Sequence, residues 1–417
     1  GGKGGKKEKG FQLESYRLRQ VALQVQYDGG AYLGFASQDC DDTVENHLFA
    51  ALTKLKLIAD RKSCRYSRCG RTDKGVSALG QVVSVCVRSA VPRDLPDALL
   101  LALPHPCAPI TLPLPTPAPA PTPLPAIVAG EKEAKAGAPA SAPAAREYRE
   151  MDYVTMLNRC LPPDIRILAW APVTDDFSAR FSASHRTYRY FFPRAKLDIL
   201  AMQQGACRLL GEHDFSNLCK MDMGNVSNFK REVFQADIRL FKRGGRYAEG
   251  VRGVVLMGVD ADAAAQAGVD TEADDAPIDT EADADAEDVY MLELRGVAFL
   301  WHMVRCIMAV LFSIGQGRED PSVLDALFDI QGNPGKPAYA MAPEAPLVLH
   351  ECGFDNLHLH QHPRNLWQLT AHYRDLLASH QVSAARARNA LDWVMEQHLV
   401  LADATNADAD ADADADA

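Results

Sequence analysis

Residues 68–83 read RCGRTDKGVSALGQVV. The first half combines glycine with charge and predicts a loop, and the second half continues into an apolar strand over 81–87. The loop places one carboxylate, Asp73, among Arg68, Arg71 and Lys74. Nearby cations keep a carboxylate ionised, so Asp73 is a candidate nucleophile or base. From composition alone, the alternative is a surface loop with local ion pairs.

The segments around this loop predict a mixed fold. A strand is expected before it, where Val21, Leu23, Val25 and Tyr27 alternate with other residues. Thr43 is expected to cap a helix, and Asp320-Pro321 to begin another. Further strands are predicted over 187–193, 232–241 and 289–295, with a helix over 299–315. Because strands and helices do not alternate regularly, the fold class is predicted as α+β.

The predicted helix over 299–315 contains one unexpected charge, Arg305, among apolar residues. A guanidinium is costly to bury without a paired anion, so Arg305 needs a carboxylate from elsewhere in the fold. Asp73 is a good candidate for that carboxylate. The alternative is that Arg305 emerges at the helix surface and extends to water.

The predicted strand over 187–193 carries aromatic residues and arginines in alternation. Tyr188 and Tyr190 share one face, and Arg189 lies on the other. Aromatic rings interleaved with arginines, including Arg180, suit base stacking and phosphate contact. The alternative is that both tyrosines are core residues with hydrogen-bonded hydroxyls.

Four segments are expected outside the folded core. Residues 1–17 are expected to form a disordered basic N-terminus. Residues 104–145 are rich in alanine and proline and are expected to form a linker. Residues 258–288 carry 12 acidic residues without lysine or arginine and predict a disordered insert. Residues 358–417 predict a helical extension, about 363–400, and an acidic Asp-Ala tail. The folded part is then expected in two halves, 18–103 with the Asp73 loop and 146–357.

The net charge of −11 argues at first against a nucleic-acid partner. However, the acidic insert and the tail after residue 402 together hold 18 carboxylates, and the charge becomes +7 once these are set aside. The remaining chain is mildly basic, which is compatible with RNA binding.

Several other classes of protein are not expected. The best apolar run, 297–315, contains two cationic or titratable residues near its middle, so no membrane span is predicted. No secretory signal is expected either. The 10 cysteines form no CxxC motif, which favours reduced thiols in the cytosol or nucleus. The common nucleotide, metalloprotease and hydrolase motifs are absent, which leaves an aspartate that acts without a metal or other cofactor.

Four segments carry a resemblance to a known family: QYDGGAYLGFASQ (26–38), RCGRTDKGVSALGQVV (68–83), FSARFSASHRTYRYFF (177–192) and AFLWHMVRCIMAVLFSIGQG (298–317). In this order they resemble the TruA family of tRNA pseudouridine synthases. GEHDFSNLCKMD (211–222) and GQGRED (315–320) are similar to one eukaryotic branch, which acts at positions 38 and 39 of tRNA. The resemblance implies a central, mostly antiparallel sheet flanked by helices, with two related halves around a basic cleft. It also implies that a homodimer is possible.

The resemblance implies roles for named residues. Asp73 matches the catalytic nucleophile, Arg305 matches the arginine that pairs with it, and Tyr188 matches the tyrosine that stacks on the target uracil. Arg71 matches the arginine that helps to hold the base outside its stem. The other expected contacts to tRNA are Arg68, Lys74, Arg180 and Arg189. No cofactor and no metal are implied, because uridine and pseudouridine are isomers.

Two alternatives to this function stay open at the level of sequence. One is a non-catalytic tRNA-binding protein that uses the same cleft. The other is a synthase of the sister branch, which acts at other tRNA positions. Lysines near the N-terminus suggest nuclear import, so the expected location is the nucleus, the cytoplasm or both.

Overall fold

The structure, a computed structural model, describes residues 13–37, 42–95, 110–112, 146–221, 224, 226–243, 246–247, 288–361 and 363–415. It divides into two compact units, one up to His360 and one from Gln361. The predicted N-terminal extension before residue 13, the predicted linker apart from 110–112, and the predicted acidic insert before Asp288 lie outside the described residues.

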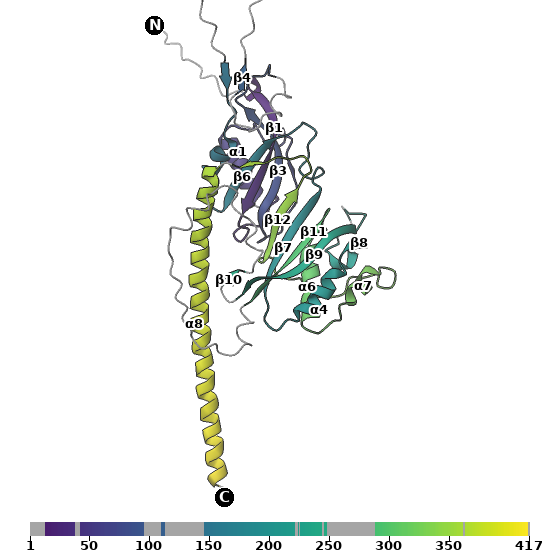
Figure 1. The fold of residues 1–417 in the computed structure, drawn as a ribbon, viewed down its shortest axis with the longest axis vertical. Helices are drawn as coiled ribbons and strands as arrows, with labels where there is room; N and C mark the ends of the chain where they lie inside the picture. The colour runs from purple at the N-terminus through teal and green to yellow at the C-terminus, as the bar shows by residue number, and fades with distance from the viewer. Residues whose placement is uncertain are drawn as a thin grey trace, which may run out of the picture. The chain divides into compact units, whose positions relative to one another are not determined.

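The first unit is built on one large sheet (Figure 1). Its strands are β1 (Arg17–Tyr27), β2 (Ser67–Arg68), β3 (Ser77–Ser89), β6 (Ile165–Pro172), β7 (His185–Pro193), β8 (Gly211–Asp214), β9 (Lys230–Arg243), β10 (Arg246–Tyr247), β11 (Val289–Gly296), β12 (Leu347–Gly353) and β13 (His360–Gln361). The order is β10-β9-β11-β7-β12-β3-β1-β6-β13, with β2 on β3 and β8 on β9. A separate pair joins β4 (Ile110–Leu112) to β5 (Arg146–Tyr148).

The sheet is mostly antiparallel, with one parallel pair at its centre. β12 runs parallel to β3 through Val348 opposite Ser77 and Leu349 opposite Ala78. On its other side β12 runs antiparallel to β7, where Leu349 lies opposite Tyr188. The Asp73 loop ends directly before Ser77, so it lies where the strands of the two sequence halves meet.

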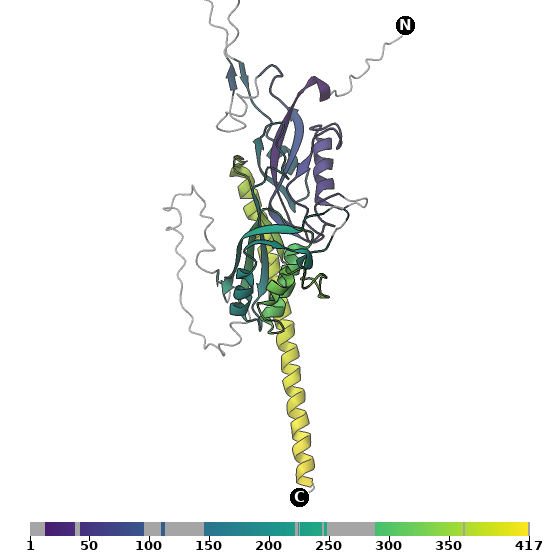
Figure 2. The same cartoon turned by 90° about the vertical axis from the view of Figure 1, so that its right-hand side faces the viewer.

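Helices cover this sheet in two groups (Figures 1 and 2). The helical segments are η1 (Leu13–Ser15), α1 (Val44–Lys54), α3 (Tyr153–Asn158), α4 (Ile199–Cys207), η2 (Ser216–Leu218), α6 (Met303–Gly315) and α7 (Val323–Phe328). α1 and α3 share a buried core with β1, β3 and β6. α4, α6 and α7 share a second core with β7, β9 and β11. The predicted α+β class is therefore confirmed.

Most predicted elements are observed, and two helix starts differ. Thr43 caps α1 through a hydrogen bond from the Asn46 amide, as predicted. The second helix begins at Val323, two residues after Pro321, and the Asp320 carboxylate accepts the Ser322 amide in the turn that precedes it. α6 begins at Met303, later than predicted, because His302 has left-handed backbone angles.

The second unit contains one helix, α8 (Pro363–Ala415). This helix continues into the predicted Asp-Ala tail, beyond the predicted end at residue 400. None of the described helices is both long enough and apolar enough to cross a membrane.

Candidate active site

The loop that carries Asp73 is fixed by the segment after β1. The Thr72 side chain is buried, and its hydroxyl lies 2.7 Å from the Tyr27 hydroxyl. The Thr72 carbonyl accepts the Phe35 amide at 3.2 Å, and the Gly75 amide donates to the Tyr32 carbonyl at 3.2 Å. These bonds hold the residues on both sides of Asp73.

Two glycines let the backbone pack this closely. Gly34 has a φ of +106°, and a Cβ there would lie 2.9 Å from the Thr72 carbonyl oxygen. Gly75 has a φ of +78°, and a Cβ there would lie 2.9 Å from the Cγ of Glu344. Positive φ angles and missing Cβ atoms are what glycine supplies. The glycine-rich character of both segments therefore serves the loop geometry.

Asp73 lies among positively polarised groups. One carboxylate oxygen is 3.4 Å from the His302 Nε2 and 3.9 Å from a terminal nitrogen of Arg305. Its side chain is 22% exposed. Burial raises the pKa of Asp73, while His302, Arg305 and a hydrogen bond from Trp301 act in the opposite direction. The result is a poorly hydrated carboxylate that remains accessible from solvent.

Arg305 has three acceptors around its guanidinium group. Nε donates to the Ala342 carbonyl at 2.8 Å, and a terminal nitrogen donates to Glu344 at 2.9 Å. The other terminal nitrogen faces Asp73. The side chain is only 12% exposed, so Arg305 does not extend to water. Its buried charge is compensated by two carboxylates and a carbonyl.

The two tyrosines of β7 lie in different surroundings. Tyr190 is buried, and its hydroxyl donates to the Pro343 carbonyl at 3.0 Å, which fixes the segment that holds Arg305. Burial raises the pKa of Tyr190 to about 12. Tyr188 is half-buried, and its ring meets Phe299 edge-on at 4.9 Å. A Cβ at Gly70 would lie 3.9 Å from the Tyr188 hydroxyl, so this tyrosine lies under the Asp73 loop.

The other residues predicted to contact RNA lie in different surroundings, some exposed and some in ion pairs. Arg71, Lys74 and Arg180 are exposed. Arg68 lies 2.6 Å from the fully buried Glu45, which Arg61 also contacts. Arg189 lies on the opposite face of β7 from Tyr188 and pairs with Glu293 at 2.7 Å. The structure therefore brings Asp73 and Arg305 together, with Tyr188 packed against Gly70 of the same loop, and gives Arg68 and Arg189 ionic partners elsewhere.

Reasoning from sequence missed three residues around Asp73. Glu344 and Trp301 carried no signal as site residues. The three-residue spacing between His302 and Arg305 gave no valid signal either, because His302 lies before the first residue of α6 and has left-handed backbone angles. Buried Arg186 was also missed as a support, although it donates to the carbonyls of Cys69 and Arg180 and so joins β7 to the loop.

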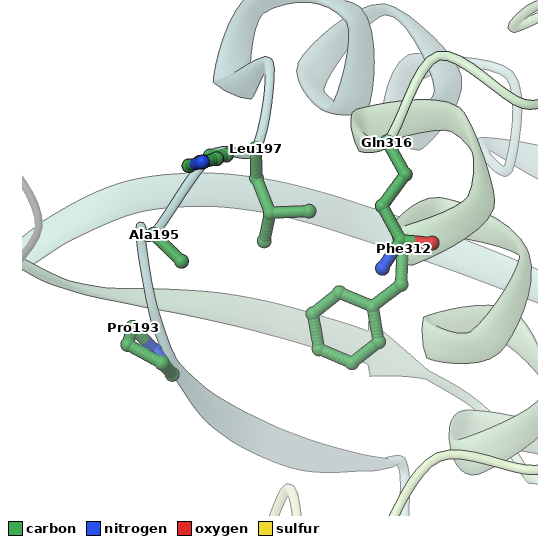
Figure 3. Close-up of a pocket in the computed structure, with 6 residues that line it drawn as sticks. Pro193, Ala195, Leu197, Phe312 and Gln316 are labelled. Atoms are coloured by element: carbon green, nitrogen blue, oxygen red, sulfur yellow. The ribbon is translucent and has the colours of Figure 1, made fainter. Parts of the chain in front are cut away.

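An apolar hollow of about 570 Å³ lies beyond the end of β7 (Figure 3). Leu197 and Phe312 face it in the figure, with Pro193, Ala195 and Gln316 around them. Phe312 is about two turns along α6 from Arg305, so this hollow is separate from the Asp73 site.

The chain is similar in sequence to known proteins over most of its length. The sequence profile described as tRNA pseudouridine synthase matches residues 206–355, which include His302, Arg305 and Glu344. A mouse protein named tRNA pseudouridine(38/39) synthase is 38% identical over 409 residues, which is 97% of this chain and 70% of the mouse protein. The chain belongs to the tRNA pseudouridine synthase family.

Other members of this family are similar over most of the chain. A human protein named tRNA pseudouridine(38/39) synthase is 40% identical over 384 residues, covering 91% of this chain and 64% of the human protein. A protein of the same name from Saccharomyces cerevisiae is 32% identical over 359 residues, covering 84% and 61%. The chain thus spans less than two thirds of these two relatives. The predicted resemblance to the pseudouridine synthases is confirmed.

Proposed function

We propose that this chain isomerises uridine to pseudouridine at positions 38 and 39 of tRNA, in the anticodon arm. The observation that carries the proposal is the cluster at the Asp73 loop, where a poorly hydrated carboxylate lies 3.9 Å from Arg305 and Gly70 of the same loop packs against the half-buried Tyr188. The printed names of the human, mouse and yeast relatives support the two positions.

The reaction explains why these side chains are needed. The bond between N1 of uracil and C1′ of ribose breaks, the base rotates, and C5 bonds to C1′. The C5 proton leaves and N1 gains a proton, so substrate and product are isomers and no redox partner is required. A base inside a stem cannot reach Asp73, so the uridine must be extruded from its stack at a cost of a few kcal/mol.

Each residue then has a role in this scheme. The Tyr188 ring offers a surface on which the extruded base stacks, and such stacking contributes about 1–3 kcal/mol. Asp73 attacks the nucleotide or removes a sugar proton, and both routes need the ionised carboxylate. Arg305 stabilises that ionised form and fixes its orientation. Exposed Arg71 would hold the extruded nucleotide.

Binding of tRNA would rest on exposed cations around the loop. Arg71, Lys74 and Arg180 are exposed and suit contacts to phosphate oxygens. Such contacts position RNA without reading its sequence, so tRNAs of different sequence should be substrates if they carry uridine at 38 or 39. We expect affinity to fall steeply with salt concentration.

Two further expectations belong to this proposal. The chain would act as a homodimer, which sedimentation velocity of the purified protein tests. It would reside in the nucleus, the cytoplasm or both, which imaging of the tagged protein tests.

The decisive experiment maps pseudouridine in a tRNA pool after incubation with the purified chain. Marks at 38 and 39 that depend on Asp73 are expected, and Asp73→Asn is the matched control because it preserves shape. Binding of tRNA without any pseudouridine would favour a non-catalytic binding protein. Pseudouridine only at other positions would assign the chain to the sister branch.

A further inference from the structure

His302 has a backbone conformation that its place in the chain does not require. It precedes the first residue of α6 and has a φ of 61° and a ψ of 7°, in the left-handed region. This region is uncommon for residues other than glycine. A residue directly before a helix can offset the cost of an unusual backbone conformation by capping the helix through its side chain. The His302 side chain makes no such capping hydrogen bond.

The conformation does bring the imidazole to one partner. Nε2 lies 3.4 Å from the Asp73 carboxylate. The other ring nitrogen, Nδ1, is buried and has no hydrogen-bond partner among the described residues. A buried polar atom without a partner costs stability. The ring position therefore satisfies the contact with Asp73 and leaves its own second nitrogen unsatisfied.

The charges around His302 indicate which form of the ring is present. Burial lowers the pKa of His302, and the cations Arg305, Lys220 and Lys336 lower it further, while Asp73 alone acts in the opposite direction. Glu344, which faces Arg305 and Asp73, completes the charged groups around this pair. Burial and these cations therefore favour the neutral form of the ring. A neutral ring carries one proton, and among the described residues the partner within reach of that proton is the Asp73 carboxylate at Nε2.

We propose that His302 is a positioning residue, whose neutral imidazole donates an Nε2–H hydrogen bond to Asp73 and keeps that carboxylate ionised and oriented. The inference rests on the proposed function for its effect on catalysis, and the strained backbone at residue 302 is the geometric means by which the ring reaches Asp73. Strain of this kind is retained where the surrounding structure enforces it, and it is frequent at functional sites.

Three substitutions separate the donor from the backbone and from the ring. His302→Gln keeps an N–H donor at a similar reach. His302→Asn tolerates left-handed angles but is too short to reach Asp73. His302→Phe keeps a ring and removes the donor. We expect His302→Asn and His302→Phe to form pseudouridine at least 10-fold more slowly in single turnover, and His302→Gln to stay within about 3-fold of the wild-type rate.

The pH dependence distinguishes positioning from mere structural support. Loss of a donor makes Asp73 harder to ionise, so the acid limb of the single-turnover profile should move to higher pH in His302→Phe and return in His302→Gln. Unchanged tRNA binding and an unchanged circular dichroism spectrum are the controls. A slow variant with an unmoved acid limb, or His302→Asn with the wild-type rate, would overturn the proposal.

A second measurement does not depend on turnover. Carboxylate carbons of aspartate can be labelled with ¹³C, and the Asp73 signal is assigned by its loss in Asp73→Asn. The Asp73 titration should move to higher pH in His302→Phe, or in His302→Asn if the Phe variant does not fold. An unmoved titration would refute the hydrogen bond. An inactive wild-type protein with a shifted titration would instead refute only the proposed reaction.

Discussion

Arg305 lies between two carboxylates and is closer to Glu344, at 2.9 Å, than to Asp73, at 3.9 Å. The shorter contact and the bond from Nε to the Ala342 carbonyl fix the guanidinium group. Asp73 is thus held near a positive charge that is already partly neutralised. Glu344 also raises the pKa of Asp73, so the two carboxylates compete for one cation.

This competition predicts opposite effects of two substitutions. Glu344→Gln should lower the pKa of Asp73, because it removes a negative charge and keeps an acceptor for Arg305. Arg305→Met should raise it, because it removes the cation that favours the ionised form. The pH profile of single-turnover pseudouridine formation measures both: the acid limb should move down in Glu344→Gln and up in Arg305→Met.

The rates should differ as well. We expect Arg305→Met to lose about 100-fold or more in rate at pH 7, while Glu344→Gln stays within about 10-fold of wild type, where 10-fold is about 1.4 kcal/mol. Met suits an apolar helix, so the fold should persist. If both substitutions move the acid limb in the same direction, the proposal that the two carboxylates compete for Arg305 is refuted.

Asp73→Asn should stabilise the fold while it abolishes activity. Because burial raises the pKa of Asp73 above its unfolded value, the ionised carboxylate destabilises the folded state at neutral pH. This destabilisation is relieved as the pH falls through the raised folded-state pKa. We expect the melting temperature of Asp73→Asn to exceed that of wild type by about a few degrees at pH 8.

The test is how the difference in melting temperature between Asp73→Asn and wild type changes with pH. It should shrink as the pH is lowered, since the wild-type carboxyl then becomes protonated as well. Binding of tRNA should remain close to wild type. A variant that melts below wild type at pH 8 would mean that the contacts of Asp73 with His302 and Arg305 outweigh its burial.

Local patterns in the sequence predicted much of the fold and part of the site. Alternation of apolar or aromatic residues with polar ones predicted β1 and β7, and the Thr43 cap predicted α1, because these elements depend on residues that are neighbours in the chain. The isolated charge of Arg305 indicated that a carboxylate had to come from elsewhere. Only the fold could reveal that Glu344 is one of the two carboxylates, since it lies far along the chain from both Asp73 and Arg305.

Other parts of the site depend on three-dimensional context that no local pattern encodes. Arg68 was expected to contact RNA as one of several loop cations, yet it compensates Glu45, which has no exposed side-chain surface. The predicted start of α6 was wrong because His302 has left-handed backbone angles, which few residues other than glycine adopt and which the sequence did not indicate.

Gly75→Ala should impair both stability and activity. Its φ of +78° costs an L-residue roughly 1–2 kcal/mol, and the new Cβ would press on Glu344. Displacing Glu344 disturbs Arg305 and hence Asp73. We expect a loss of at least 10-fold in the rate of pseudouridine formation, with a destabilisation measurable by urea unfolding.

Gly317 supplies a matched control for this substitution. It has a similar φ, +67°, but a Cβ there would meet nothing within 4 Å. Gly317→Ala should therefore cost a similar amount of stability and leave the rate almost unchanged. Equal losses of rate in both variants would show that Gly75 acts through global stability alone.

Removal of the Tyr188 ring should reduce activity more than it reduces stability. This side chain is half-buried under the Asp73 loop, and its ring is the proposed stacking surface for the extruded uracil. Loss of about 1–3 kcal/mol of stacking corresponds to roughly 5- to 150-fold in kcat/KM for Tyr188→Ala. Tyr188→Phe keeps the ring and should stay near the wild-type value.

Tyr190 is the control on the same face of β7, because it is buried and its hydroxyl donates to the Pro343 carbonyl. Tyr190→Ala should be destabilised by about 3–5 kcal/mol, the usual cost of deleting a core aromatic ring, and should lose less activity per folded molecule. Rates normalised to the folded fraction measured by urea unfolding decide between them. If Tyr188→Ala loses stability but keeps its normalised rate, Tyr188 is a core residue and the base stacks elsewhere.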